Sequence, residues 1–226
     1  MAGARQDPAA TQKGERGGMT SLKLAGLMCS RLCHDLAGPI GALQNGIELM
    51  AEDDDPDLQA QAMDLVAMAS DQAGRKLRFY RLVFGAGLAG GEDLPSEECR
   101  AALAGLLDGG RIQLDWSLSD GVWPRQLGRL VLALTLIASQ GMPRGGRLAV
   151  APGDGQATEP GGVAVTCAGE GAALDQGAAG FLSGERALDD AATPGDAVAC
   201  LAYELSGETA RPVTIEAADG GFRLRL

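Results

Sequence analysis

His34 is the only histidine of the 226-residue chain, and its neighbours could make it reactive. Asp35 follows directly, and a carboxylate there can accept a hydrogen bond from one ring nitrogen and leave the other as a nucleophile. Cys33 precedes the histidine and Cys29 lies one helical turn earlier, but a zinc site would need further ligands that the nearby sequence does not offer. We therefore predict that His34 is a nucleophile, oriented or tuned by Asp35, with an idle surface histidine as the alternative.

A proline five residues after the histidine is the second unusual feature. Pro39 is flanked by Gly38 and Gly41. A proline inside a helix removes a backbone hydrogen bond and bends the helix, at a cost of about 3 kcal/mol. Two interpretations remain open: a tolerated kink, or a surface of small residues beside His34 that lets another protein approach closely.

Apolar residues recur around His34 at the three-and-four spacing of one long amphipathic helix, which we expect to begin after an N-cap at Thr20 or Ser21. They are Leu22, Ala25, Cys29, Leu32, Leu36, Ile40, Leu43, Ile47 and Met50. At about 100° per residue, His34 points roughly 160° away from the centre of this stripe, so we expect its imidazole to face solvent. Residues 1–18 are small, polar and without periodicity, and we expect them to form a disordered tail.

A second long helix follows an acidic turn that contains Pro56, a residue suited to the first helical position. We expect it to run from about Leu58 to Leu88. Its apolar face comprises Leu65, Val66, Ala69, Ala73, Tyr80, Val83 and Phe84. Two helices joined by so short a turn must be antiparallel, and a lone hairpin cannot shield its apolar stripe from water. We therefore expect residues 19–90 to pair with a second copy in a homodimeric four-helix bundle that includes Leu32, Leu36 and Tyr80.

Charge is unevenly distributed along this hairpin. Residues 46–64, at its tip, hold seven acids and no base, whereas the rest holds six bases against Asp35 and Asp71. If residues i and about 109 − i lie opposite one another, Arg75 is level with His34, and Arg78 with Arg31. These arginines could stabilise negative charge beside the imidazole and attract an acidic partner, although a solvated basic face is the ordinary interpretation.

A glycine-rich stretch from Gly85 to Pro95 separates the hairpin from a second domain, residues 91–226. We expect helices at about 96–107, 125–140 and 196–206, and strands at 111–118, 147–151, 163–167, 213–217 and 222–226. These elements predict an α/β domain with a mixed sheet and helices on one face, and an α+β chain as a whole.

Composition excludes several classes of protein. A formal net charge of −11 argues against nucleic-acid binding, and the longest apolar run is about half of what a membrane span needs. The five cysteines are odd in number and lie mostly in apolar patterns, which favours reduced core thiols. We therefore expect a cytoplasmic protein that binds neither nucleic acid nor membrane.

The string from Arg31 to Leu49, RLCHDLAGPIGALQNGIEL, resembles the phosphoacceptor helix of histidine kinases in its histidine, adjacent acid and proline. It is more similar still to the dimeric histidine phosphotransferases of alphaproteobacterial phosphorelays. The resemblance covers the chain after the tail, and it implies a kinase-type ATP-binding domain behind the hairpin. It also implies phosphorylation of His34 on a ring nitrogen, and partners that are receiver domains of a hybrid histidine kinase and of response regulators.

The second domain departs from the kinase pattern at three places. Ala133 and Ile137 fall where the ATP-binding helix would carry asparagines, and Cys167 stands in place of the adenine-reading aspartate. Near residues 193–198, Gly195 is all that remains of a glycine-rich phosphate loop. A magnesium ligand is therefore missing. We expect no ATP, cofactor or metal site in this chain, and magnesium only in the receiver partner.

These observations predict a histidine phosphotransferase that relays phosphoryl groups between receiver-domain aspartates through phospho-His34. The expected partner-binding residues are Arg31, Gly38, Pro39, Gly41, Asn45, Arg75 and Arg78. One alternative is an ATP-dependent sensor kinase core, which measurable nucleotide affinity would reveal. The other is a non-catalytic adaptor with a kinase-like fold, which an inert His34 would favour.

Overall fold

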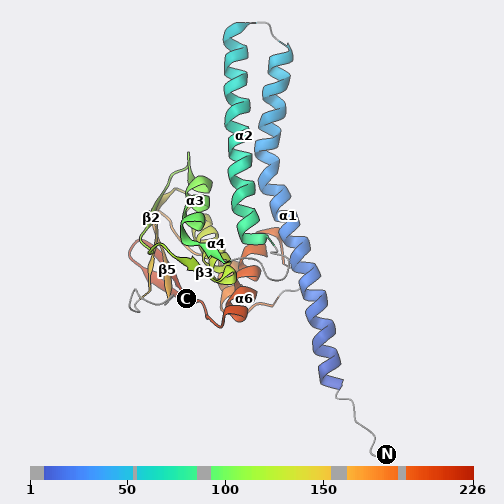
Figure 1. The fold of residues 1–226 in the computed structure, drawn as a ribbon, viewed down its shortest axis with the longest axis vertical. Helices are drawn as coiled ribbons and strands as arrows, with labels where there is room; N and C mark the ends of the chain where they lie inside the picture. Colours follow the sequence, from blue (N-terminus) through green and yellow to red (C-terminus); the bar gives the residue numbers. More distant parts are fainter. Residues whose placement is uncertain (1–7, 53–54, 86–92, 154–161, 188–191) are drawn as a thin grey trace, which may run out of the picture.

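The computed structural model describes residues 8–52, 55–85, 93–153, 162–187 and 192–226. Two long helices, α1 (Pro8–Glu52) and α2 (Pro56–Phe84), form an antiparallel hairpin that rises above a second, α/β unit packed beside its base (Figure 1). Pro56 is the first helical residue of α2, and the Asp55 carboxylate accepts a hydrogen bond of 2.9 Å from the Asp57 amide. The predicted fold class, a long helical hairpin followed by an α/β domain, is confirmed.

The ends of both hairpin helices differ from the prediction. Helix α1 begins at Pro8, so residues 8–18 of the expected tail are helical, and neither Thr20 nor Ser21 is an N-cap. These residues include alanine, glutamine, lysine and arginine, which favour a helix, and extending an existing helix costs little compared with starting one. Helix α2 ends at Phe84 rather than near Leu88. Residues 1–7 and 86–92 lie outside the described residues.

The two helices approach each other closely toward the tip of the hairpin. A Cβ atom added at Gly46 would lie 2.6 Å from Val66 Cγ2 and 3.2 Å from the Ala62 carbonyl oxygen. A side chain at position 46 would therefore push α1 and α2 apart.

The second unit is a mixed five-stranded sheet in the order β2-β4-β5-β7-β6. Its strands are β2 (Ile112–Trp116), β4 (Gly146–Pro152), β5 (Val163–Ala168), β6 (Thr214–Ala218) and β7 (Gly221–Arg225). Strand β2 is parallel to β4, and the other neighbours are antiparallel. Along β4, Leu148 and Val150 are fully buried while Arg147 is exposed, so one face of the sheet is covered. The expected mixed sheet is confirmed.

Three longer helices belong to this unit: α3 (Ser96–Leu107), α4 (Arg125–Gln140) and α6 (Ala197–Thr209). Pro95 is the N-cap residue of α3, and Pro124 is the N-cap residue of α4. Four short elements were not expected, because segments of two to seven residues carry little periodic signal. They are β1 (Leu94–Pro95), β3 (Val122–Trp123), α5 (Gln176–Leu182) and the 3-10 turn η1 (Pro194–Asp196).

Helix α4 is the centre of the core and joins the two units. Every residue from Leu130 to Ala138 is buried. On the hairpin side, Phe79 and Val83 of α2 are fully buried in the same cluster, and Arg129 Nε donates to the Val83 carbonyl oxygen at 2.9 Å. The base of the hairpin is therefore fixed to the α/β unit, while its upper part projects beyond it.

All five thiols are free. Cys99, Cys167 and Cys200 are buried, and burial raises the pKa of each to about 12. The prediction of core thiols is wrong for Cys29 and Cys33, which are exposed on α1. Within the described parts of the chain, no helix is long and apolar enough to cross a membrane.

Candidate functional site

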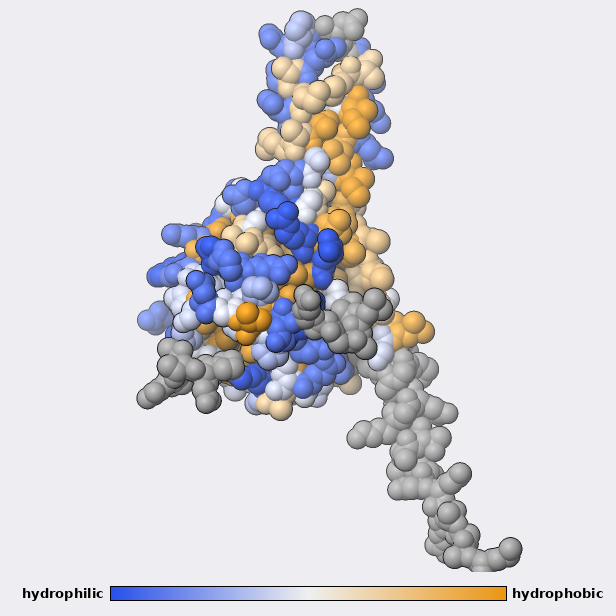
Figure 2. All heavy atoms as spheres, viewed as in Figure 1, coloured by the Kyte–Doolittle hydropathy of each residue, from blue (hydrophilic) through white to orange (hydrophobic). Residues whose placement is uncertain are grey.

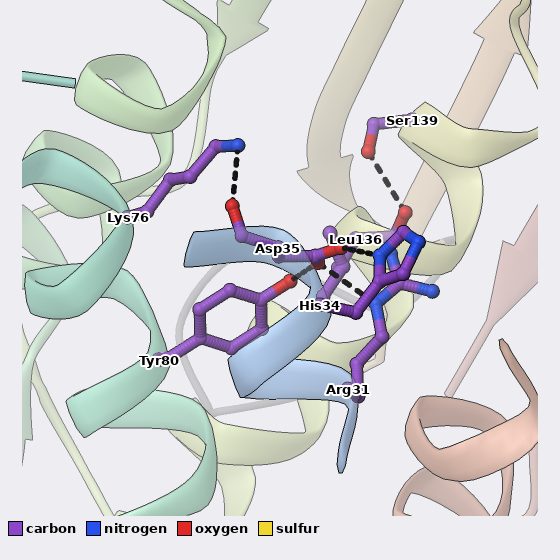
Figure 3. A network of polar contacts seen from close by, with 7 residues as sticks. All are labelled: Arg31, His34, Asp35, Lys76, Tyr80, Leu136 and Ser139. Atoms are coloured by element: carbon purple, nitrogen blue, oxygen red, sulfur yellow. Dashed lines mark hydrogen bonds and ion pairs between the residues drawn. The ribbon is translucent and has the colours of Figure 1, made fainter. Parts of the chain in front are cut away.

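His34 lies on the outward face of α1, and 81% of its side chain is exposed. The predicted orientation is therefore confirmed, and the ring contributes little to packing. Its Nδ1 atom lies 3.0 Å from Asp35 Oδ1, as expected from their adjacency (Figure 3). The opposite ring nitrogen, Nε2, remains open to an incoming group.

Asp35 is held from two helices. Its second oxygen, Oδ2, accepts a hydrogen bond of 2.8 Å from Arg31 Nε, one turn earlier on α1. The same oxygen accepts the hydroxyl of Tyr80, which reaches across from α2. The backbone carbonyl of Asp35 accepts a hydrogen bond of 2.8 Å from Lys76 Nζ, also on α2 (Figure 3). The residue next to the exposed imidazole is therefore rigidly placed.

These contacts keep Asp35 ionised. Partial burial alone would raise the pKa of Asp35, but hydrogen bonds from Tyr80, His34 and Arg31 outweigh burial and lower it. Burial and the neighbouring carboxylate both raise the pKa of Tyr80, so its hydroxyl stays a donor. An ionised Asp35 accepts a hydrogen bond from Nδ1–H of a neutral His34, which leaves the lone pair on Nε2.

Tyr80 is the residue of this site that sequence reasoning placed elsewhere. Its position on the apolar face of α2 predicted a place in the dimer core, but its ring is 3% exposed within a single chain. An amphipathic pattern shows that a face is covered without showing by what. Its hydroxyl was the available signal, because a buried tyrosine hydroxyl usually finds a hydrogen-bond partner.

The surface toward the hairpin tip contains three of the four predicted docking residues. Gly38 and Asn45 are exposed and Gly41 is half-buried, and a Cβ added at either glycine would meet no atom within 4 Å. Pro39 is buried, so its predicted place on this surface is wrong. Pro39 lies one residue beyond the exposed Gly38, and the 100° step along the helix turns it away from the surface.

The arginines predicted to surround the imidazole are only partly in place. Arg31 binds Asp35, as described above. Arg75 forms ion pairs with Asp71, at 3.0 Å, and with Asp108 after α3, so it points toward the second unit and the prediction is wrong. The expectation that residues i and about 109 − i lie opposite one another gives the level of a residue along the hairpin. It does not give the direction in which the side chain points around the helix axis. Arg78 is exposed on α2.

Three positions of the second unit that would carry nucleotide-binding groups in a kinase hold other side chains, all of them among the described residues. Ala133 is fully buried and Ile137 nearly so, within a buried stretch of α4 whose one polar side chain is Thr135. The thiol of Cys167 is buried and directed at the Ala138 carbonyl oxygen, 3.5 Å away. The Asp196 carboxylate is used locally, since its Oδ2 accepts hydrogen bonds of 2.8 Å from both the amide and the hydroxyl of Thr193.

A cleft of about 430 Å³ does remain beside α4 and α5. Its lining includes Ile137, Gly171 and Asp175, with no lysine or arginine that could bind a phosphate. No group of three histidine, cysteine, aspartate or glutamate side chains able to hold a metal ion occurs in the described ranges.

Comparisons with known proteins relate the chain to phosphotransferases. The "Protein phosphotransferase ChpT" of Brucella abortus (strain 2308) is 32% identical over 145 residues, which cover 63% of this chain and 66%, just under two thirds, of that protein. A solved structure of a bacterial phosphotransferase superposes with a TM-score of 0.78 at 26% identity, covering 90% of this chain and 95% of the other. The family model of the histidine phosphotransferase C-terminal domain matches residues 96–221, more than half of the chain. The chain therefore belongs to the histidine phosphotransferase family.

Proposed function

We propose that this protein relays phosphoryl groups between receiver-domain aspartates through Nε2 of His34. The observation that carries the proposal is the pairing of an 81% exposed imidazole with an ionised carboxylate on its Nδ1 side. A solvent-facing nucleophile of this kind suits a phosphoryl donor that is itself a protein. Family membership and the ChpT relative support the same activity.

The transfer needs no general acid or base, because no proton is taken up or released in this step. The Nε2 lone pair attacks the phosphorus of the receiver's aspartyl phosphate, the Nε2–P bond forms, and the bond from phosphorus to the carboxylate oxygen breaks. The proton on Nδ1 stays there, so the ring becomes positively charged beside the Asp35 carboxylate. The reverse reaction delivers the phosphoryl group to another receiver. Magnesium would be bound by the receiver and not by this chain.

A homodimer explains the apolar surface that a single hairpin leaves exposed. Leu22, Ile40 and Ile47 are 76%, 47% and 58% exposed, and their spacings place them within about 20° of one another on α1. Met63 and Leu77 of α2 are also exposed. Figure 2 shows apolar side chains gathered along the hairpin above the second unit. Pairing two hairpins in a four-helix bundle would bury this strip, which costs free energy when left in water.

The receiver would dock on the face of α1 that carries His34, Gly38, Gly41 and Asn45. One turn beyond Asn45, a groove of about 450 Å³ opens between the two helices. Leu49, Glu52, Leu58, Gln61, Ala62 and Leu65 line this groove. Its mostly apolar lining, with one carboxylate at Glu52, suits an amphipathic helix of the receiver that carries a basic residue beside its apolar face. The receivers of a hybrid histidine kinase and of response regulators, in the cytoplasm, are the expected partners.

An ATP-dependent kinase is the less favoured alternative. Buried apolar side chains at positions 133 and 137 and a buried thiol at 167 offer no ligand for magnesium and no acceptor for adenine. A non-catalytic adaptor is also less favoured, because an adaptor has no need of a carboxylate fixed beside an exposed imidazole.

The direct experiment mixes the purified protein with a radiolabelled phosphorylated receiver and isolates the chain. We expect a phosphoryl group that is labile in acid and stable in base, as phosphohistidine is. His34→Ala should abolish this uptake and keep the wild-type melting temperature, because the exposed ring packs against little. Label retained by His34→Ala would overturn the assignment of His34. Label acquired from ATP without a receiver would restore the kinase alternative.

A further inference from the structure

Tyr80 couples the packing of the hairpin to the carboxylate beside His34. Its ring packs edge-on against Phe79, with centroids 5.9 Å apart, and tilted against Phe84 at 4.9 Å. Only 3% of the residue is exposed. The ring therefore has little freedom, and its hydroxyl is held at one point, on Asp35 Oδ2.

The two oxygens of Asp35 are used differently. Tyr80 and Arg31 both donate to Oδ2, from different helices, whereas Oδ1 lies 3.0 Å from His34 Nδ1. Rotation of the carboxylate would break both hydrogen bonds to Oδ2. With these two donors in place, Oδ1 stays directed at the imidazole (Figure 3).

We propose that Tyr80 is a positioning residue for His34: by holding Oδ2 of Asp35, it keeps Oδ1 on Nδ1 and thereby selects the tautomer whose Nε2 is the nucleophile. Its effect on the transfer rate rests on the proposed function, whereas its effect on the ring does not. The exposed imidazole has no other contact in the structure that would fix its protonation pattern, since its single hydrogen bond among the described residues is to Asp35.

The selected tautomer matters in both directions of transfer. A ring protonated on Nε2 has no lone pair there and cannot attack phosphorus. After transfer, the positively charged ring is stabilised by the same contact with Oδ1. The lowered pKa of Asp35 keeps this carboxylate ionised. Loss of the Tyr80 hydroxyl would let the carboxylate turn and weaken both effects, although the aromatic packing would remain.

The chain allows an unusually direct test, because it contains one histidine and two tyrosines. Growth with [15N]histidine labels a single imidazole, whose nitrogen chemical shifts report which atom carries the proton. Tyr80→Phe removes the hydroxyl and keeps the ring. Tyr203→Phe is the matched control, because Tyr203 lies on α6 and is 47% exposed.

At a pH where His34 is neutral, we expect wild type and Tyr203→Phe to show protonated Nδ1 and unprotonated Nε2. Tyr80→Phe should show a mixture of both tautomers. Its phosphotransfer rate from a phosphorylated receiver should fall by about tenfold, the equivalent of one hydrogen bond to a charged group. Arg31→Gln, which removes the other donor to Oδ2, should move the tautomer in the same direction.

The tautomer and the transfer rate of Tyr80→Phe together decide whether the inference holds. A wild-type tautomer and rate in Tyr80→Phe would overturn the inference. A reduced rate with an unchanged tautomer would show that the Tyr80 hydroxyl acts otherwise than by selecting the tautomer, which also overturns it. A tautomer shift in Tyr80→Phe, with no phosphoryl uptake by any variant or by wild type, would support the inference and contradict the proposed function. Far-UV circular dichroism and melting curves verify folding, and Arg31→Gln tests the Oδ2 contact if Tyr80→Phe unfolds.

Discussion

Lys76 supplies to α1 the hydrogen bond that Pro39 removes from it. In an α-helix, the amide of residue 39 would donate to the carbonyl of residue 35, and proline has no such donor. Lys76 Nζ, on the neighbouring helix, donates to that Asp35 carbonyl at 2.8 Å. The gap in α1 created by Pro39 is thus filled by α2 in the residue next to His34.

This relationship predicts that substitutions at positions 76 and 39 have non-additive effects on the free energy of unfolding. Lys76→Met should lower the free energy of unfolding by about 1–2 kcal/mol, because the half-buried carbonyl of Asp35 loses its donor. In a Pro39→Ala background the backbone N–H at position 39 can take over, so the same change should cost less. Urea denaturation of the four proteins measures the coupling. Equal costs of Lys76→Met in both backgrounds would contradict the interpretation.

Asp35 should make stability depend on pH in an acidic window. Despite burial, the pKa of Asp35 in the folded state is below its ordinary value of about 3.9, because Tyr80, His34 and Arg31 donate to the carboxylate. A group with a lowered folded-state pKa stabilises the protein above its unfolded-state pKa, and this contribution disappears as pH falls through the folded-state pKa.

We therefore expect Asp35→Asn to be less stable than wild type at pH 7, with the difference narrowing below about pH 4. Chemical denaturation of both proteins at pH 7 and pH 3 provides the comparison. Asp71→Asn is a suitable control, because Asp71 is 66% exposed in its ion pair with Arg75. A wild-type advantage over Asp35→Asn that is the same at both pH values would show that the charge of Asp35 is not what stabilises the fold.

Helical spacing predicted the two long helices and the exposure of His34, and the short turn between the helices predicted the hairpin, because each of these features depends on local sequence. It also placed Asp35 beside the imidazole. The same reasoning misplaced Tyr80. An apolar face of α2 has the same sequence pattern whether α1 or a second copy of the chain covers it.

Contacts between distant parts of the chain could not be predicted in the same way. Arg75 pairs with Asp108, 33 residues away and beyond the domain boundary, so no local pattern indicates the contact. The apolar spacing predicted α4, but only the structure shows that Arg129 on it anchors the base of the hairpin at Val83. Local periodicity thus predicted the elements, whereas the orientation of charged side chains depended on tertiary packing.

Nucleotide should leave the thermal stability of the protein unchanged. A ligand that binds only the folded state raises the melting temperature, by an amount that grows with the logarithm of its concentration relative to Kd. Because Ala133, Ile137 and Cys167 are buried and offer no magnesium or adenine contacts, millimolar ATP with magnesium should give no saturable shift. Differential scanning fluorimetry with and without magnesium measures this. A saturable rise that requires magnesium would show that a functional nucleotide site exists.

Two residues of α1, only two positions apart, lie on its proposed dimer face and on its proposed docking face. Ile47 is 58% exposed within one chain, on the apolar strip shared with Leu22 and Ile40, whereas Asn45 is exposed about 200° away around the helix. Ile47→Glu leaves its carboxylate in water in a single chain, but a four-helix core would bury it at a cost of several kcal/mol. It should therefore dissociate the dimer or unfold the bundle.

Asn45→Glu should leave the dimer intact and slow phosphoryl transfer, because it adds a negative charge where the receiver approaches His34. Sedimentation of both variants beside wild type, combined with the receiver assay, gives the contrast. Since the two substitutions introduce the same side chain two positions apart, helix propensity and net charge are matched, and only the direction around α1 differs. A fully active Ile47→Glu dimer, or a monomeric Asn45→Glu, would mean that the two faces of α1 have been assigned the wrong way round.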